Sequence, residues 1–135
     1  MVEIQIEYEG NLRCSATHME SGTILITDAP KDNQGLGSSF SPTDLVATAL
    51  GTCMLTIMGI TARKMQLDFS EAKVRVIKEM TATPPRKIAR LSVRFDIPLK
   101  LTDEQKQQLE NAANACPVCR SLDPEVQRAV EFHWG

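Results

Sequence analysis

One segment dominates the sequence, a long apolar run that follows a strong helix start. Ser41 suits the N-cap, Pro42 the first helical position, and Asp44 the reciprocal place in a capping box. The pattern predicts a helix to about Met65, longer than about 30 Å at about 1.5 Å per residue. Because this helix is apolar on nearly all sides until Arg63, we expect it to be buried on most of its circumference.

Small residues lie along this predicted helix. Gly51 and Gly59 each cost about 1 kcal/mol relative to alanine in a helix, and Ala49, Thr52 and Thr56 lie beside them. We therefore expect another backbone to come very close. A chain of 135 residues can hardly bury so long a helix with one sheet, and a symmetric second copy is the simplest cover. The sequence thus predicts a homodimer.

Strands and shorter helices account for the rest of the chain. Thr102 and Gln105 form a capping box at the start of a helix over residues 101–115, and Cys116-Pro117 begins a short helical piece. Apolar alternation predicts strands over residues 2–8, 12–16, 23–27, 72–80, 87–98 and 126–134. The order β-β-β-α-β-β-α-β indicates an α+β fold in a single domain over residues 1–135. A long loop over residues 28–42 is of the kind that is usually functional or mobile.

The charge pattern and the apolar runs limit the partners. The net charge is −2 and no basic run is longer than two residues, so we expect no nucleic-acid partner. The most apolar stretch, residues 45–60, is short and rich in Gly and Thr for a bilayer span, so no membrane partner is expected. The first ten residues lack the pattern of a secretory signal, and we expect a cytoplasmic protein.

Four cysteines carry the possible chemistry, and a reducing compartment makes a structural disulfide framework improbable. Cys116 precedes Pro117 at a helix start, where backbone N–H groups and the helix dipole favour a thiolate. The alternative is a buried thiol that caps a turn. Cys119 completes a C-x-x-C motif, but this motif follows a helix near the C-terminus, unlike that of thioredoxin-like enzymes.

The remaining cysteines have weaker signals. Cys53 lies in the middle of the apolar helix, where burial raises a thiol pKa, so it becomes a nucleophile only beside a cation. Cys14 alternates with small and apolar residues along a strand and is predicted to be core. Zinc binding by the C-x-x-C would need further ligands, and His18 and His133 are isolated in the sequence.

Three segments together resemble the OsmC/Ohr family. The segment "SPTDLVATALGTCMLTI" is similar to the family's signature around its first reactive cysteine, and "ACPVC" is similar to its second site, a Cys-Pro-x-Ser. The loop "DAPKDNQGLGSSFSP" resembles the Gly-rich lead-in of the OsmC-like branch. The likeness covers nearly the whole chain, including the order of its elements.

The resemblance implies an OsmC-like fold, an intertwined homodimer in which antiparallel sheets pack on two long central helices. It also implies reduction of organic hydroperoxides in oxidative-stress defence, without a cofactor or metal. By this match Cys53 is the peroxidatic thiol and Cys116 the resolving thiol, and an external dithiol restores the pair. Arg13 matches the family's arginine, which would hold the Cys53 thiolate, although a surface charge is the alternative.

Two departures from the family pattern bear on function. Ohr enzymes have a glutamate ten residues before the first cysteine, and Thr43 stands at that position here. The nearby acidic residue is Asp44, and an alternative is that it serves as a helix cap and nothing more. Cys119 replaces the usual serine. An alternative function is therefore a stress-associated protein that binds an apolar small molecule with little catalysis. A third is redox handling or metal capture by Cys116 and Cys119.

Overall fold

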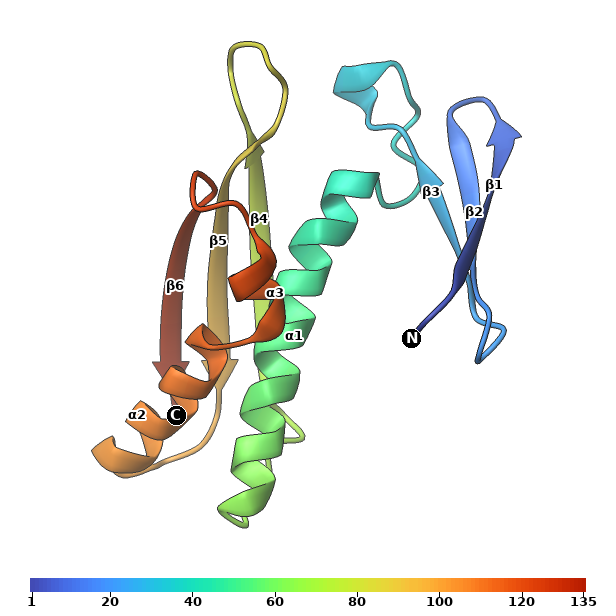
Figure 1. The fold of residues 1–135 in the computed structure, drawn as a ribbon. Helices are drawn as coiled ribbons and strands as arrows, with labels where there is room; N and C mark the ends of the chain where they lie inside the picture. Colours follow the sequence, from blue (N-terminus) through green and yellow to red (C-terminus); the bar gives the residue numbers. More distant parts are fainter. The chain divides into compact units, whose positions relative to one another are not determined.

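The structure is a computed structural model that describes residues 1–135. The elements occur in the predicted order (Figure 1). They are β1 (Ile4–Gly10), β2 (Arg13–His18), β3 (Ile24–Asp28), the short 3-10 helix η1 (Lys31–Asn33), α1 (Pro42–Lys64), β4 (Lys73–Met80), β5 (Ile88–Ile97), α2 (Asp103–Asn114), α3 (Pro117–Ser121) and β6 (Gln127–Trp134). The chain forms two compact units, residues 1–46 and 47–135, and the two sheets are divided between them.

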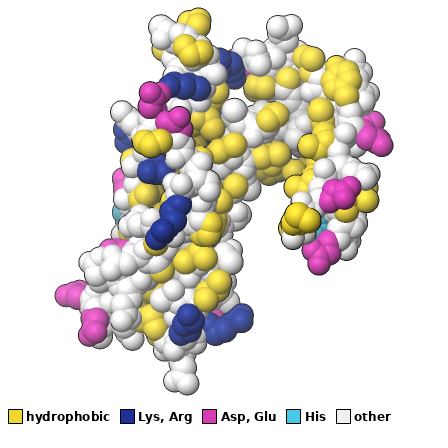
Figure 2. Space-filling view, viewed as in Figure 1, with side chains coloured by type: hydrophobic (Ala, Val, Ile, Leu, Met, Phe, Trp, Pro, Cys, Tyr) yellow, Lys and Arg dark blue, Asp and Glu magenta, His cyan; other side chains and the backbone are white.

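The first unit contains the antiparallel sheet β1-β2-β3. Pairing of Ile6 with Ala16 and of Tyr8 with Cys14 places these side chains on one face, as alternation predicted. This apolar face is exposed, and Figure 2 shows hydrophobic side chains at the surface of the unit. Leu12, predicted to lie in the second strand, is instead in the β1–β2 turn with a φ of 63°.

The loop before α1 ends in the predicted capping box. The Asp44 backbone N–H donates to the Ser41 hydroxyl at 3.1 Å, and the Ser41 N–H donates to the Asp44 carboxylate at 2.9 Å. Upstream, the N–H of Asp28 donates to the Phe40 carbonyl at 3.0 Å, so the loop returns to the end of β3. These bonds fix the residue at which α1 begins.

The second unit contains the sheet β4-β5-β6. β4 and β5 form the predicted antiparallel hairpin, but β6 runs parallel to β5. The sheet is therefore mixed, whereas the sequence analysis expected antiparallel sheets. The physical reason is the connection: α2 and α3 carry the chain back along the sheet, and such a crossover joins parallel strands.

Helix α1 packs on this sheet together with α2 and α3 (Figure 1). Its buried residues recur on one side and are Ala47, Leu50, Gly51, Met54, Met58 and Ala62. The opposite side, with Thr52, Thr56 and Ile60, is exposed, so the predicted burial around most of the helix is not found within one chain. The reason is geometric, because one sheet face can cover only one face of a helix.

The glycines of α1 differ in their surroundings. A Cβ on Gly51 would lie 2.7 Å from the Val76 side chain of β4, so the approach at this position is close, but a side chain makes it and not the predicted backbone. A Cβ on Gly59 would have no atom within 4 Å. The close approach is therefore limited to the part of α1 that lies against β4.

By length and composition alone, α1 could cross a membrane, because one window of its 23 residues has a mean hydropathy of 1.8. The sequence argument that this segment is too short is therefore not supported. The core helix of a globular protein has the same composition, and a third of this window is buried, at 33%. The packing of α1 on its own sheet indicates that it is such a core helix.

Candidate active site: a cluster of three thiols

The sequence places Cys116 at the start of α3, and the structure confirms it as the N-cap. Its φ and ψ of −66° and 151° are extended, Pro117 begins the helix, and the backbone N–H of Cys119 donates to the Cys116 sulfur at 3.3 Å. Cys116 is fully buried, in the same apolar core as Leu50 and Met54 of α1. This position faces the middle of the long helix.

Cys53 projects from the middle of α1 and meets this N-cap. It packs against the core that contains Cys116, and its thiol lies close enough to the Cys116 thiol and to the Val118 backbone for each to affect its pKa. Cys53 is half-buried, and all four cysteines are in the free thiol form. Two cysteines that are 63 residues apart in the sequence, at positions 53 and 116, are thus side by side.

Cys119 adds a third sulfur to the cluster. The Cys116 thiol donates to the Cys119 sulfur at 3.1 Å, and the Cys119 thiol lies 3.9 Å from the Ala113 carbonyl. A disulfide bond is about 2.05 Å long, so a movement of about 1 Å would join these sulfurs. Cys116 therefore has two possible disulfide partners.

Burial controls the ionisation of Cys53 and Cys116. Desolvation raises the pKa of Cys53 above its ordinary value, and the Cys116 thiol raises it further, while the Val118 backbone partly opposes the shift. Desolvation also raises the pKa of Cys116, and the Cys119 thiol adds to the effect. Of the two interpretations that the sequence left open for Cys116, this direction favours the buried thiol that caps a turn. The Cys119 backbone N–H does lower this pKa, but burial outweighs it.

Cys14 lies in the first unit, on β2, paired with Tyr8 and Thr27. It is half-buried rather than part of the core that the sequence predicted. The reason is that the apolar face of its sheet is exposed. Cys14 is not a member of the thiol cluster.

Arg13 begins β2 and belongs to a polar group in the first unit. Its guanidinium donates to the Ser38 hydroxyl at 3.1 Å and lies 3.8 Å from the carboxylate of Asp28, its partner in the strand register. Asp28 is only 1% exposed and accepts two bonds from Ser38, at 2.5 Å from the hydroxyl and 3.0 Å from the backbone N–H. The Ser38 bonds and then the Arg13 charge hold the pKa of Asp28 below its ordinary value.

Two residues of this polar group, Asp28 and Ser38, were not predicted from the sequence. Asp28 and Ser38 hold Arg13, although the sequence analysis considered Asp44 for the acidic residue of the site. Asp44 binds Ser41 at the helix cap, and the Thr43 hydroxyl lies 3.2 Å from that of Ser41. The hairpin register from β2 to β3 was the available signal, since it places Asp28 opposite Arg13.

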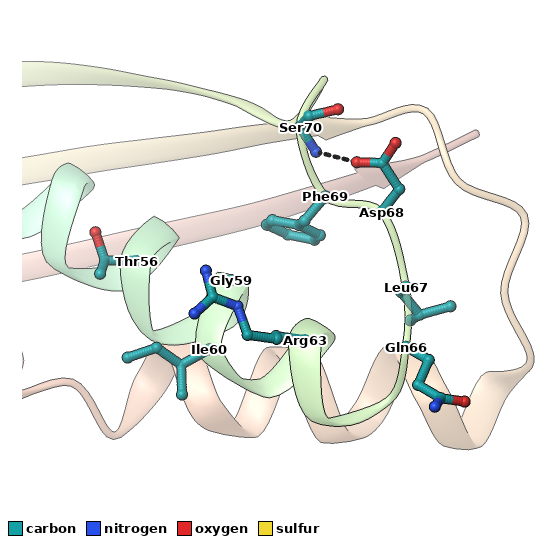
Figure 3. A pocket seen from close by; sticks show the side chains of 9 residues that line it. All are labelled: Thr56, Gly59, Ile60, Arg63, Gln66, Leu67, Asp68, Phe69 and Ser70. Carbon is teal, nitrogen blue, oxygen red and sulfur yellow. Dashed lines mark hydrogen bonds between the residues drawn. The ribbon is translucent and has the colours of Figure 1, made fainter.

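The pockets of the second unit include two that bear on the site. One, of about 380 Å³, is bordered by Cys119 and by the arginines 120 and 128. The other, of about 600 Å³, lies at the far end of α1 (Figure 3). There the Arg63 side chain extends along α1 toward Gly59, with the Phe69 ring on another wall. None of the predicted site residues lines this larger pocket.

The C-x-x-C has no further metal ligands around it. No group of three or more His, Cys, Asp or Glu side chains is arranged to hold a metal ion. The chemistry that the cluster offers is thiol chemistry, in which one sulfur is oxidised and a second forms a disulfide with it.

Comparison with known proteins agrees with this fold. A crystal structure from Psychrobacter arcticus, described as an osmotic stress induced and detoxification response protein, is 42% identical, with 98% of this chain and 96% of that chain covered and a TM-score of 0.93. No curated protein sequence matches the chain.

More distant structures have the same fold. An organic hydroperoxide resistance protein OsmC from Legionella pneumophila is 15% identical, with coverage of 98% and 96% and a TM-score of 0.77. An organic hydroperoxide resistance protein from Vibrio cholerae, with captopril bound in one of its active sites, is 22% identical, with coverage of 98% and 90% and a TM-score of 0.72. The sequence profile described as "OsmC-like protein" matches residues 35–131, and the chain therefore belongs to the OsmC-like family.

Proposed function

We propose that this protein reduces organic hydroperoxides with Cys53 as the peroxidatic thiol and Cys116 as the resolving thiol. The observation that carries the proposal is the contact between these two thiols. The names of the Legionella and Vibrio proteins, which refer to organic hydroperoxide resistance, support the substrate class.

The reaction proceeds in three balanced steps. The Cys53 thiolate attacks the O–O bond and becomes a sulfenic acid, and the alkoxide that leaves takes a proton from water to become the alcohol. The Cys116 thiol then condenses with the sulfenic acid, forming a disulfide and water. An external dithiol reduces this disulfide by exchange and is itself oxidised to a disulfide.

The first step needs a thiolate, and burial opposes it by raising the pKa of Cys53. A cation beside Cys53 is therefore part of the proposal, and Arg13 is the candidate because a guanidinium stays charged when desolvated. Ser38 and Asp28 hold the Arg13 side chain in a defined position. Asp44 serves the site as a positioning residue, because it caps the helix that carries Cys53.

A homodimer is also part of the proposal. Ile4, Ile6 and Tyr8 form one apolar face of β1 and are 56%, 65% and 67% exposed. Apolar faces of this kind mark interaction surfaces, and a second copy of the chain would cover this one. Light scattering that found only monomer at micromolar concentration would contradict this part.

Steady-state peroxide consumption tests the reaction. With cumene hydroperoxide and dithiothreitol, wild type turns over, and Cys53→Ser loses activity by a factor of about 100 or more, because no sulfenic acid forms. Cys116→Ser instead accumulates the Cys53 sulfenic acid, which dimedone traps. Cys14→Ser is the matched control for the loss of one thiol and retains activity. Equal turnover by wild type and Cys53→Ser would refute the proposal.

The raised pKa of both thiols favours a second candidate, a protein that binds an apolar small molecule with little catalysis. Binding would then be independent of thiol ionisation. A thermal shift with fatty acids that persists in Cys53→Ser, without peroxide consumption by wild type, would support this candidate over the first.

A further inference from the structure

We propose that Cys119 is a third redox residue, which takes the disulfide over from Cys53 and presents it as a Cys116–Cys119 disulfide to the external dithiol. This relay rests on the proposed function, because Cys53 must first be oxidised by the peroxide. It assigns a role to the cysteine that departs from the family's Cys-Pro-x-Ser pattern.

The positions of the two sulfurs on α3 suit exchange. Cys116 is the N-cap and Cys119 is three residues on, so one helical turn brings both sulfurs to the same side. They lie 3.1 Å apart, with the Cys116 thiol donating its proton to the Cys119 sulfur. Cys119 therefore approaches the Cys116 sulfur, to which Cys53 would be bonded in the first disulfide.

The pocket beside α3 distinguishes Cys119 from the other two thiols of the cluster. Cys116 is 0% exposed, and neither Cys116 nor Cys53 borders the pocket beside α3. Cys119 does border it, together with Leu50, Met54, Asn114, Arg120, Arg128 and Val130. With a volume of about 380 Å³, this pocket can admit a small dithiol. A reductant that enters it meets Cys119 rather than the buried Cys116.

Two arginines give this pocket a positive charge. Arg128 donates to the Cys119 carbonyl at 2.8 Å, and Arg120 donates to the Ala115 carbonyl at 3.2 Å. No acidic side chain borders the pocket. A reductant that approaches as a thiolate anion is therefore attracted to the pocket that Cys119 borders.

The exchange step conserves electrons and protons. The Cys119 thiolate attacks the Cys116 sulfur of the Cys53–Cys116 disulfide, the Cys116–Cys119 bond forms, and Cys53 leaves as a thiolate. No net oxidation occurs in this step. The external dithiol then attacks the Cys116–Cys119 bond, becomes a disulfide itself and leaves both cysteines reduced.

Peptide mapping after a single turnover tests the relay. Trypsin releases Cys53 within residues 32–63 and both Cys116 and Cys119 within residues 107–120. After one equivalent of cumene hydroperoxide without reductant, followed by an acid quench, the Cys53–Cys116 disulfide joins the two peptides. The relayed disulfide lies within residues 107–120, which then lack two hydrogens. We expect the joined peptides to form first and the oxidised single peptide to replace them.

The variant Cys119→Ser restores the residue that is usual in the family and stops the relay. We expect it to keep the two peptides joined and to be reduced by dithiothreitol about tenfold more slowly than wild type, because access limits thiol exchange. Cys14→Ser is the matched control and behaves as wild type. A wild type that keeps the peptides joined, with the same reduction rate as Cys119→Ser, would overturn the relay.

Two further outcomes separate the relay from the proposed function. If Cys53→Ser yields the oxidised peptide at the wild-type rate, peroxide oxidises the C-x-x-C directly and the relay is wrong. If Cys119→Ser neither consumes peroxide nor joins the peptides, the proposed function itself fails and the relay with it. If Cys119→Ser turns over but wild type never forms the oxidised peptide, only the relay fails.

Discussion

The two compact units of the chain differ in how they cover their apolar side chains. In residues 47–135, helices pack on one face of the sheet β4-β5-β6, and Phe95 in that sheet is 0% exposed. In residues 1–46, Ile6 and Tyr8 on one face of the sheet β1-β2-β3 are 65% and 67% exposed. The second unit thus completes a core from its own residues, whereas the first leaves one apolar face of its sheet exposed.

The groups that the proposed function uses are also divided between the two units. The three clustered thiols lie in the second unit, and Arg13 with its carboxylate partner lies in the first. Burial without a cation raises the pKa of Cys53, so the second unit by itself is a weak nucleophile. The difference teaches that the proposed function needs groups from both units, because the proposed nucleophile belongs to one unit and the candidate cation to the other.

The largest expected effect is in the self-contained core. Phe95 stacks on Phe132 with ring centroids 5.0 Å apart, and Phe95→Ala leaves a cavity there. We expect the free energy of unfolding to fall by about 3–5 kcal/mol, measured by urea denaturation. Ile77→Ala on the exposed face of β4 is the control, with a loss below about 1 kcal/mol. Equal losses for both variants would mean that the core of this unit is not where the structure places it.

The second prediction concerns the exposed face of the first unit. Ile6→Asp places a charge on that face, whereas Gln5→Asp places the same charge on the opposite face of β1. Since burying one isoleucine contributes about 1.5–3 kcal/mol, we expect Ile6→Asp to raise the dimer dissociation constant by about 100-fold. Analytical ultracentrifugation measures it. If Gln5→Asp weakens the dimer equally, the apolar face is not the interface.

Local sequence signals predicted the positions of the elements well. The capping boxes at Ser41 and Thr102 and the cap at Cys116 are all present, because each depends on residues within three positions of one another. The contact of Cys53 with Cys116 followed from the family resemblance and not from local pattern.

The features that the sequence did not predict depend on distant parts of the chain. The parallel direction of β6 is set by the path of α2 and α3, and the open side of α1 by the extent of one sheet. The raised pKa of Cys116 comes from burial that a local N-cap pattern does not include. Likewise, Ser38 reaches Asp28 across ten residues of loop, so no short motif indicates the pair.

The third prediction tests whether the two units cooperate. Arg13→Gln removes the candidate cation, so the pKa of Cys53 should rise further and its thiolate fraction at neutral pH should fall. We expect the midpoint for alkylation of Cys53 by iodoacetamide to move up by about one pH unit, or about 1.4 kcal/mol. Mass spectrometry of residues 32–63 follows the reaction. Arg63→Gln, on the same helix as Cys53, is the charge-matched control. An unchanged midpoint in Arg13→Gln would mean that Arg13 does not act on the ionisation of Cys53.

The smallest effects distinguish the covered and open sides of α1. Gly51→Ala should destabilise the fold by about 1 kcal/mol, because overpacking against Val76 outweighs the gain in helix propensity. Gly59→Ala should stabilise it by up to about 1 kcal/mol, since nothing lies within 4 Å of the added methyl group. Urea denaturation of both variants gives the signs. If Gly59→Ala is also destabilising, the side of α1 that is exposed in one chain is covered in solution. Both units would then depend on another molecule to cover their apolar side chains.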